Sequence, residues 1–130
     1  MLRELRVDEN LPGSAKIRAA IDSGWLVSVP LPGDDLVRVL NMELDRGESE
    51  AIALALAHQT DLVLLDESEG RETARNLNLT PVGTLSVLIK AKQTGSIRSI
   101  KDEVTALREK AGFYIAPDLY TRILALAGEA

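Results

Sequence analysis

The run of residues 61–66 (DLVLLD) constrains the fold of this chain more than any other feature. A short apolar run bounded by acids is typical of a central strand in a parallel sheet. Residues 48–58, just before it, form helix readily and are apolar almost all round, so we expect a buried helix there. Residues 49–58 of this helix would span about 15 Å, and residues 61–65 of the strand about 16 Å. Because only two or three residues join the two segments, they must run antiparallel.

The rest of the chain alternates between segments that favour helices and strands. Residues 2–6 are expected to be the end of a helix. Further helices are expected over residues 14–21, 36–40, 69–77, 84–94, 100–110 and 118–127. Strands are expected at 25–29 and 80–83 in addition to 61–66. Ser14, Asp34 and Thr84 are the predicted N-caps of their helices. The alternation predicts an α/β fold with a parallel sheet. Since no linker interrupts it, we expect one domain over residues 1–130.

The composition excludes several classes of protein. There is no cysteine, which excludes disulfides, zinc–thiolate sites and thiol catalysis and suits a reducing cytoplasm. No run of about 18 apolar residues could span a membrane, and the N-terminus lacks the apolar stretch of a signal peptide. We therefore expect a cytoplasmic protein that does not bind membranes.

Charge is spread unevenly along the chain. The net charge is −5, whereas a protein that holds nucleic acid by bulk charge is usually basic. Residues 1–70 hold 6 Lys/Arg and 14 Asp/Glu, a net of −8, and residues 71–110 hold 8 and 4, a net of +4. The pattern fits either solvated helix faces or an acidic metal pocket beside a phosphate-binding rim.

Several acids are expected to meet at one edge of the sheet. The antiparallel helix and strand place Glu48 and Glu50 near Asp66 and Glu67, at the edge where open α/β sheets hold their sites. Thr84 follows the next expected strand and should lie at the same edge of the sheet. An all-oxygen set of this kind suits Mg²⁺ or Mn²⁺, which can activate water for displacement at phosphorus.

A purely structural interpretation of these residues stays open. Glu48 and Glu50 would be favourable at the positive end of any helix dipole, and Asp66 could be only the N-cap of the next helix. Arg71 and Arg75 lie one turn apart and could hold phosphate or form a solvated face.

Three segments together resemble a PIN-like family. Residues 47–55 (GESEAIALA) are similar to its "GE-x-EAIALA" segment, and residues 64–74 to its "LLDE..GR..A" segment. Residues 83–92 resemble its "GTLGVL..AK" segment, with Ser86 where the family usually has Gly. The resemblance covers roughly residues 14–128 as an ordered set.

The resemblance implies a fold and an activity. PIN domains are three-layer α/β proteins that act as Mg²⁺/Mn²⁺-dependent ribonucleases, and many are VapC-type toxins of toxin–antitoxin pairs. Glu50 and Asp66 match the family's acidic positions and would hold the metal, with Glu48 and Glu67 as further catalytic acids. Thr84 and Arg71 would contact the substrate. The implied partners are RNA, an antitoxin protein and a second copy of the chain.

The N-terminus departs from the family pattern. PIN-like chains begin with a central strand that ends in Asp and is followed by a helix, and this sequence shows neither, so we expect an N-terminally truncated PIN-like fold. Loss of that strand would expose pairing edges on its neighbours, which a partner chain could cover. The missing Asp leads to an alternative function, a catalytically degenerate PIN-like protein that acts as a protein-binding module.

Overall fold

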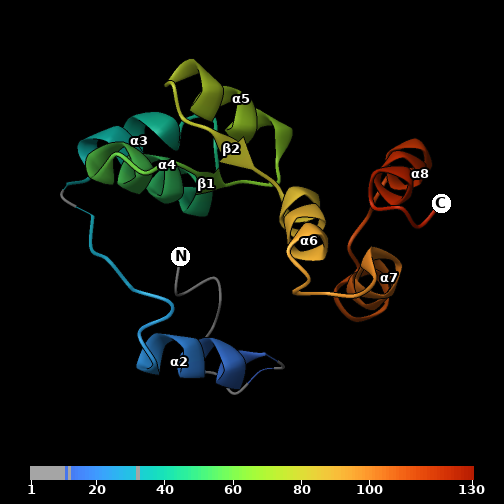
Figure 1. Ribbon diagram of the computed structural model, residues 1–130. Coiled ribbons are helices and arrows are strands. Elements are labelled where there is room, and N and C mark those ends of the chain that lie inside the picture. Colours follow the sequence, from blue (N-terminus) through green and yellow to red (C-terminus); the bar gives the residue numbers. More distant parts are fainter. Residues whose placement is uncertain (1–10, 12, 32) are drawn as a thin grey trace. The chain divides into compact units, whose positions relative to one another are not determined.

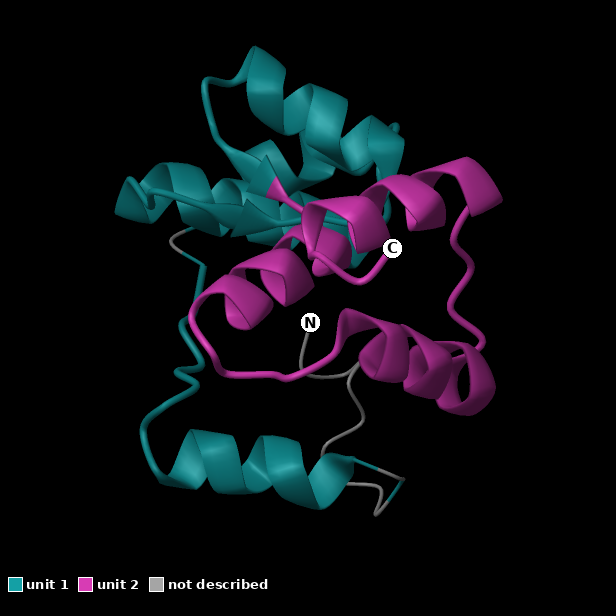
Figure 2. Cartoon of the chain, turned by 45° about the vertical axis from the view of Figure 1, so that its right-hand side comes forward, with its two compact units in different colours: residues 1–81 teal, residues 82–130 magenta. Residues whose placement is uncertain are grey.

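A computed structural model describes residues 11, 13–31 and 33–130. The helix end expected at residues 2–6 lies outside this range. The chain divides into two compact units, Met1–Pro81 and Val82–Ala130 (Figure 2). In chain order the elements (Figure 1) are α2 (Ser14–Asp22), α3 (Asp35–Leu40), α4 (Arg46–His58), β1 (Val63–Leu64), α5 (Ser68–Asn76), β2 (Pro81–Val82), α6 (Thr84–Gln93), α7 (Ile100–Ala111) and α8 (Pro117–Leu126).

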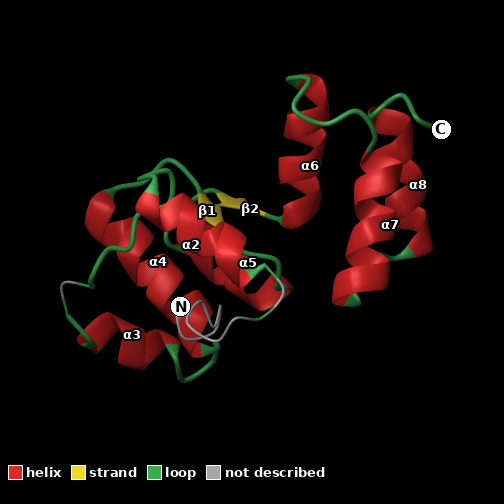
Figure 3. Cartoon of the chain, turned by 90° about the horizontal axis from the view of Figure 1, so that it is seen from below, coloured by secondary structure: helices red, strands yellow, loops and turns green. Residues whose placement is uncertain are grey.

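The expected α/β class is confirmed, because the described residues form helices and a short parallel sheet. The strands β1 and β2 pair with each other, and helices make up the rest of the regular structure (Figure 3). A backbone hydrogen bond from the N–H of Val63 to the carbonyl of Thr80 joins the two segments at 3.0 Å. Within the described residues both strands are shorter than the sequence predicts.

The core of the first unit forms around α4. This helix contacts α3, β1 and α5, as the apolar pattern of residues 48–58 predicts for a buried helix. It ends at Gln59, whose φ of 50° is left-handed. The buried side chains of this core are Leu44, Ile52, Ala55, Val63, Leu65 and Ala74.

The strand β1 is buried on one side only. Val63 and Leu65 belong to the core, whereas Leu62 is 57% exposed and Leu64 is 67% exposed. Side chains alternate between the two faces of a strand, so the core face of β1 is covered and the opposite face is open. The strand expected at the centre of a sheet is therefore covered on one face only in this structure.

Three local predictions are also wrong. Residues 25–29 form no strand, because a β-strand needs a hydrogen-bonded neighbour and this segment pairs with none among the described residues. Gly13 and Gly83, rather than Ser14 and Thr84, occupy the N-cap positions of α2 and α6. In α2 the hydroxyl of Ser14 instead accepts a hydrogen bond from the backbone of Leu11.

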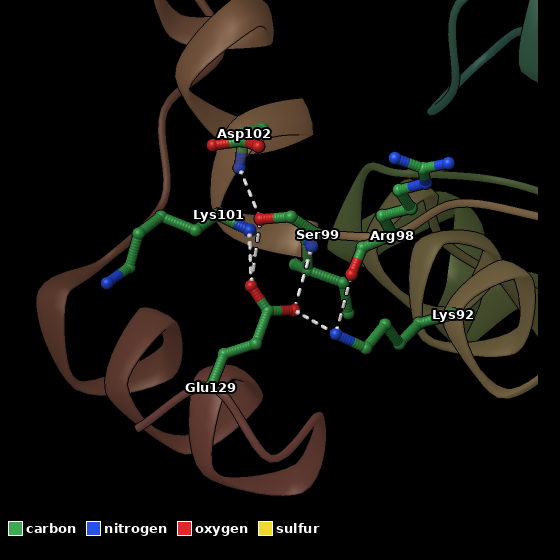
Figure 4. A network of polar contacts seen from close by, with 7 residues as sticks. Lys92, Arg98, Ser99, Lys101, Asp102 and Glu129 are labelled. Atoms are coloured by element: carbon green, nitrogen blue, oxygen red, sulfur yellow. Dashed lines mark hydrogen bonds and ion pairs between the residues drawn. The ribbon is translucent and has the colours of Figure 1, made fainter. Parts of the chain in front are cut away.

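The second unit has its own core and a network of hydrogen bonds at its C-terminal end. Ile100, Val104, Ile115 and Ile123 are buried together. After α8, the carboxylate of Glu129 reaches the start of α7 (Figure 4). It accepts hydrogen bonds from Ser99 Oγ at 3.0 Å, the Ile100 N–H at 2.8 Å, the Lys101 N–H at 3.1 Å and Lys92 Nζ at 3.2 Å.

This hydrogen-bond network satisfies backbone N–H groups at the start of α7, which have no partner within the helix itself. The hydrogen bond from the Ile100 N–H, followed by that from Lys101, lowers the pKa of Glu129 to about 2. A carboxyl group with a pKa below its unfolded value stabilises the fold above the unfolded pKa, and this contribution disappears as the pH falls toward the folded pKa.

We predict that Glu129→Gln lowers the melting temperature at pH 7, because it removes the charge that α7 and Lys92 hold. The difference from wild type should shrink between pH 4.5 and about 2, where wild-type Glu129 becomes protonated. Thermal melts followed by circular dichroism measure both effects. Glu109→Gln is the control, because Glu109 is exposed on α7. It should change stability by no more than about 0.5 kcal/mol. A difference that persists unchanged to pH 2 would contradict the prediction.

Candidate functional site

The first turn of α4 is fixed by a side-chain cap. Asp45 is the N-cap, and its Oδ1 accepts a hydrogen bond from the N–H of Glu48 at 2.8 Å. The hydroxyl of buried Ser49 donates to the carbonyl of Asp45 at 2.7 Å. These contacts hold the turn that carries Glu48 and Glu50 and set where the two carboxylates emerge.

Glu48 has a buried oxygen with no hydrogen-bond partner in the described part of the chain. This atom, Oε1, is shielded from solvent and unpaired. It lies against Gly70 of α5, so closely that a Cβ on Gly70 would stand 2.9 Å from it. Buried polar atoms in folded proteins are nearly always paired, so this oxygen marks a place where an interaction is missing.

The electrostatic surroundings of Glu48 are acidic. Burial is the largest cause that raises the pKa of this carboxyl. The negative charges of Asp45, Glu67 and Glu69 raise the pKa further. A hydrogen bond with the Asp45 backbone acts in the opposite direction. Glu67 thus comes close enough to Glu48 to act on its charge, as the antiparallel helix and strand predict.

Glu50 has a different environment from Glu48. Its Oε1 accepts a hydrogen bond from Arg46 Nε at 2.8 Å, one turn earlier in α4. This hydrogen bond is the first cause that lowers the pKa of Glu50. The side chain of Arg46 is 74% exposed, so the arginine can leave the pair without disturbing the core.

Asp66, Glu67 and Arg71 lie together where β1 leads into α5. Asp66 follows the core residue Leu65 and is exposed. Glu67 is the N-cap residue of α5, although its side chain makes no cap hydrogen bond. The guanidinium of Arg71 donates to the backbone carbonyl of Asp66. The arginine therefore lies beside the two acids, at the carboxyl end of the strand.

Thr84 is the first residue of α6 and is half-buried. It belongs to the second compact unit, whereas the acids belong to the first. Its role as a substrate contact stays a prediction.

An acidic hollow of about 520 Å³ lies in the same unit as the acids. Its lining is mainly polar and consists of Glu43, Leu44, Glu69, Glu72, Thr73 and Asn76. Glu69 is shared between this hollow and the surroundings of Glu48.

Two searches of the described residues found nothing. No group of three or more His, Cys, Asp or Glu side chains there is arranged to hold a metal ion. No helix within that range is long and apolar enough to cross a membrane.

Sequence reasoning missed three contributors to this site. Asp45 fixes the turn, Arg46 pairs with Glu50, and Gly70 makes room for the Glu48 carboxylate. The spacing of Asp45 to Glu48 is a recognisable capping signal. The contact between Gly70 and Glu48 joins two segments distant in sequence, so no local pattern could have revealed it.

The fold and the acids together define an α/β protein with a carboxylate-rich edge at the carboxyl end of a parallel strand. A comparison with protein families matches the PIN domain over residues 1–129. The chain therefore belongs to the PIN domain family, which confirms the resemblance of its three sequence segments. Searches of curated proteins and of solved structures gave no significant match.

Proposed function

We propose that this chain is a metal-dependent ribonuclease of the PIN type and a candidate toxin of a toxin–antitoxin pair. The observation that carries the proposal is the buried, unpaired oxygen of Glu48 within an acidic environment. A cytoplasmic location and an antitoxin partner belong to the same proposal.

The donor chemistry around Glu48 suits Mg²⁺ or Mn²⁺. These ions prefer carboxylate oxygens, and an orphaned carboxylate oxygen surrounded by like charges is stabilised by a cation. Gly70, which has no Cβ, makes room for this oxygen. Because no three such side chains are arranged around one point in the described residues, Glu48 would bind the ion first, and Glu50 and Asp66 would have to move toward it. When bound, it would supply a Lewis acid and lower the pKa of a water molecule.

The side chains of the chain itself would bind and orient the RNA. Arg71 is the cation next to Asp66 and would contact a phosphate, since a guanidinium matches phosphate oxygens well. Glu67 adds a carboxylate next to Asp66 that could accept a proton from water. Thr84 would contact the RNA through its hydroxyl.

We predict that Asp66→Asn lowers Mn²⁺-dependent cleavage of RNA at least about tenfold, because the substitution removes a metal-binding charge and keeps the side-chain size. Gel analysis of a set of structured and single-stranded RNAs measures cleavage with Mn²⁺ and with a chelator. Asp61→Asn is the matched control, because Asp61 precedes the start of β1 whereas Asp66 follows its end. This variant should cleave RNA as the wild type does. An Asp66→Asn protein as active as wild type would refute the assignment.

Two observations favour a second candidate function. No three potential ligands come together in the described part of the chain, and the carboxylate of Glu50 is paired with Arg46. Both observations fit a catalytically degenerate PIN protein that serves as a protein-binding module. This alternative predicts no metal-dependent cleavage of any RNA by the wild type.

A further inference from the structure

Four hydrogen-bond donors converge on one carboxylate at the start of α7 (Figure 4). Oε1 of Glu129 accepts from Ser99 Oγ and from the Lys101 N–H. Oε2 accepts from the Ile100 N–H and from Lys92 Nζ. We call these four groups the donor cluster. Each oxygen has two donors, and a phosphate group is bound in the same way by backbone N–H groups and a cation.

The donor cluster is held by contacts that do not involve Glu129. Lys92 Nζ also donates to the carbonyl of Arg98 at 2.8 Å. Ser99 is the N-cap of α7, and its Oγ accepts a hydrogen bond from the Asp102 N–H at 3.1 Å. The two backbone donors belong to the first turn of the helix. Because α7 has a side-chain cap of its own, the carboxylate of Glu129 is an additional anion bound at this place.

The donor cluster lies in a basic stretch of the chain. Residues 82–101 contain no Asp or Glu and four basic residues, Lys90, Lys92, Arg98 and Lys101. The side chains of Arg98 and Lys101 are exposed, and neither takes part in an ion pair within the described residues. In Figure 4 they extend away from Glu129 on different sides of it. Two cations that Glu129 does not neutralise therefore flank the cluster.

Charge also separates the two compact units of the chain. Residues 82–130 hold 7 Lys/Arg and 5 Asp/Glu, a net of +2. Residues 1–81 hold 8 and 15, a net of −7. The second unit is thus the part of this acidic chain that attracts a polyanion.

We propose that the donor cluster binds a phosphate group, and that Glu129 occupies the cluster as an internal competitor until the phosphate displaces it. The backbone N–H of Glu129 is held by the carbonyl of Leu124 at 2.8 Å, so the side chain can leave by rotation alone. The flanking cations favour a phosphate of RNA over a free phosphate ion. Binding here needs no metal ion and no cleavage, so this proposal can fail independently of the ribonuclease proposal.

Inorganic phosphate is the first probe. Glu129→Ala removes the competitor, so millimolar phosphate should raise the melting temperature of this variant by about 3 °C or more beyond the shift in the wild type. Chloride at equal ionic strength is the reference for each protein. Combining Glu129→Ala with Lys92→Met removes one donor and should abolish most of the extra shift. Glu109→Ala, exposed on α7, is the matched control and should respond as the wild type does. Equal shifts in the wild type, Glu129→Ala and the double variant would overturn the proposal.

A short single-stranded RNA distinguishes the two sources of phosphate. Its binding is measured by fluorescence anisotropy with a chelator present, so that no metal-dependent cleavage occurs. If the RNA backbone enters the cluster, Glu129→Ala should bind the RNA at least about threefold more tightly than the wild type, and Arg98→Gln should reduce this gain. A gain in affinity for inorganic phosphate alone would assign the cluster to a small phosphate. No gain for either probe would overturn the proposal.

Nuclear magnetic resonance of the wild type keeps the proposal testable if Glu129→Ala fails to fold. As inorganic phosphate is added, the amide signals of Ile100 and Lys101 should shift and reach saturation. The side-chain carboxyl signal of Glu129 should shift over the same range, because the carboxylate leaves the cluster. Amide signals at the start of α8 should stay unchanged. The absence of a saturable shift at Ile100, Lys101 and Glu129 would contradict the proposal.

Discussion

Glu48→Gln is expected to lower Mn²⁺-dependent RNA cleavage about 100-fold while it stabilises the metal-free protein. The substitution removes the charge of a proposed metal ligand, and the loss of such electrostatic stabilisation has effects of this size in enzymes. The same charge is buried, repelled by Asp45, Glu67 and Glu69, and lacks a partner at Oε1. Its removal should therefore raise the free energy of unfolding by about 1 kcal/mol.

The pH dependence of this gain has a definite sign. Burial and the neighbouring acids raise the pKa of Glu48 above 4.5 in the folded state. Between the unfolded and folded pKa values the folded protein binds more protons, so stability falls as the pH rises. The destabilisation is thus largest above the folded pKa and absent below pH 4.5. Glu48→Gln should remove this contribution.

Urea unfolding of both proteins at pH 4 and pH 7.5, with and without Mn²⁺, measures these effects. Mn²⁺ should stabilise the wild type, because a ligand that binds only the folded state raises stability, and it should leave Glu48→Gln unchanged. Glu72→Gln, exposed on α5, is the control. A Glu48→Gln protein that is less stable than wild type at pH 7.5 would contradict the account.

Gly70→Val is expected to destabilise the fold by about 1 kcal/mol, since the clashing atoms are at the flexible end of the Glu48 side chain. A Cβ at this position would stand 2.9 Å from Glu48 Oε1 and 3.3 Å from its Cδ, and valine adds two methyl groups beyond the Cβ. Overpacking of this kind has effects of about 1–3 kcal/mol. The displaced Glu48 carboxylate should also lose its affinity for Mn²⁺.

A double-mutant cycle isolates this contact. Glu48→Ala should remove most of the penalty of Gly70→Val, with a coupling energy of about 0.5 kcal/mol or more. Gly33→Val is the control, because a Cβ at Gly33 meets nothing within 4 Å, and it should change stability by no more than about 0.5 kcal/mol. Equal effects of Gly70→Val in the presence and absence of the Glu48 side chain would rule out the clash as the cause.

Most of the fold could be predicted from local patterns. The helix formers before residue 61 predict α4, and the apolar run at 61–66 predicts β1, because apolar residues concentrate in segments that pack against the core. The strand expected at 25–29 is wrong, since the pattern reports a preference for β-structure and not the presence of a partner strand. For the same reason the sequence could not show that one face of β1 is open.

The candidate site was predictable in its residue types and less so in its contacts. The helix–strand geometry predicted that Glu48 and Glu67 would lie near each other, and their charges interact in the structure. The family pattern gives Glu50 the leading role. The structure instead pairs Glu50 with Arg46 and leaves Glu48 with an unpaired oxygen beside Gly70. That difference depends on side-chain packing between α4 and α5, which spacing does not encode.

Calorimetric titration of Mn²⁺ into the wild type, Glu48→Gln and Glu72→Gln tests most directly whether the acids around Glu48 form a cation site. We predict saturable binding to the wild type and to Glu72→Gln, and binding at least about tenfold weaker to Glu48→Gln. Equal Mn²⁺ affinity of the wild type and Glu48→Gln, or no binding by the wild type, would contradict the account.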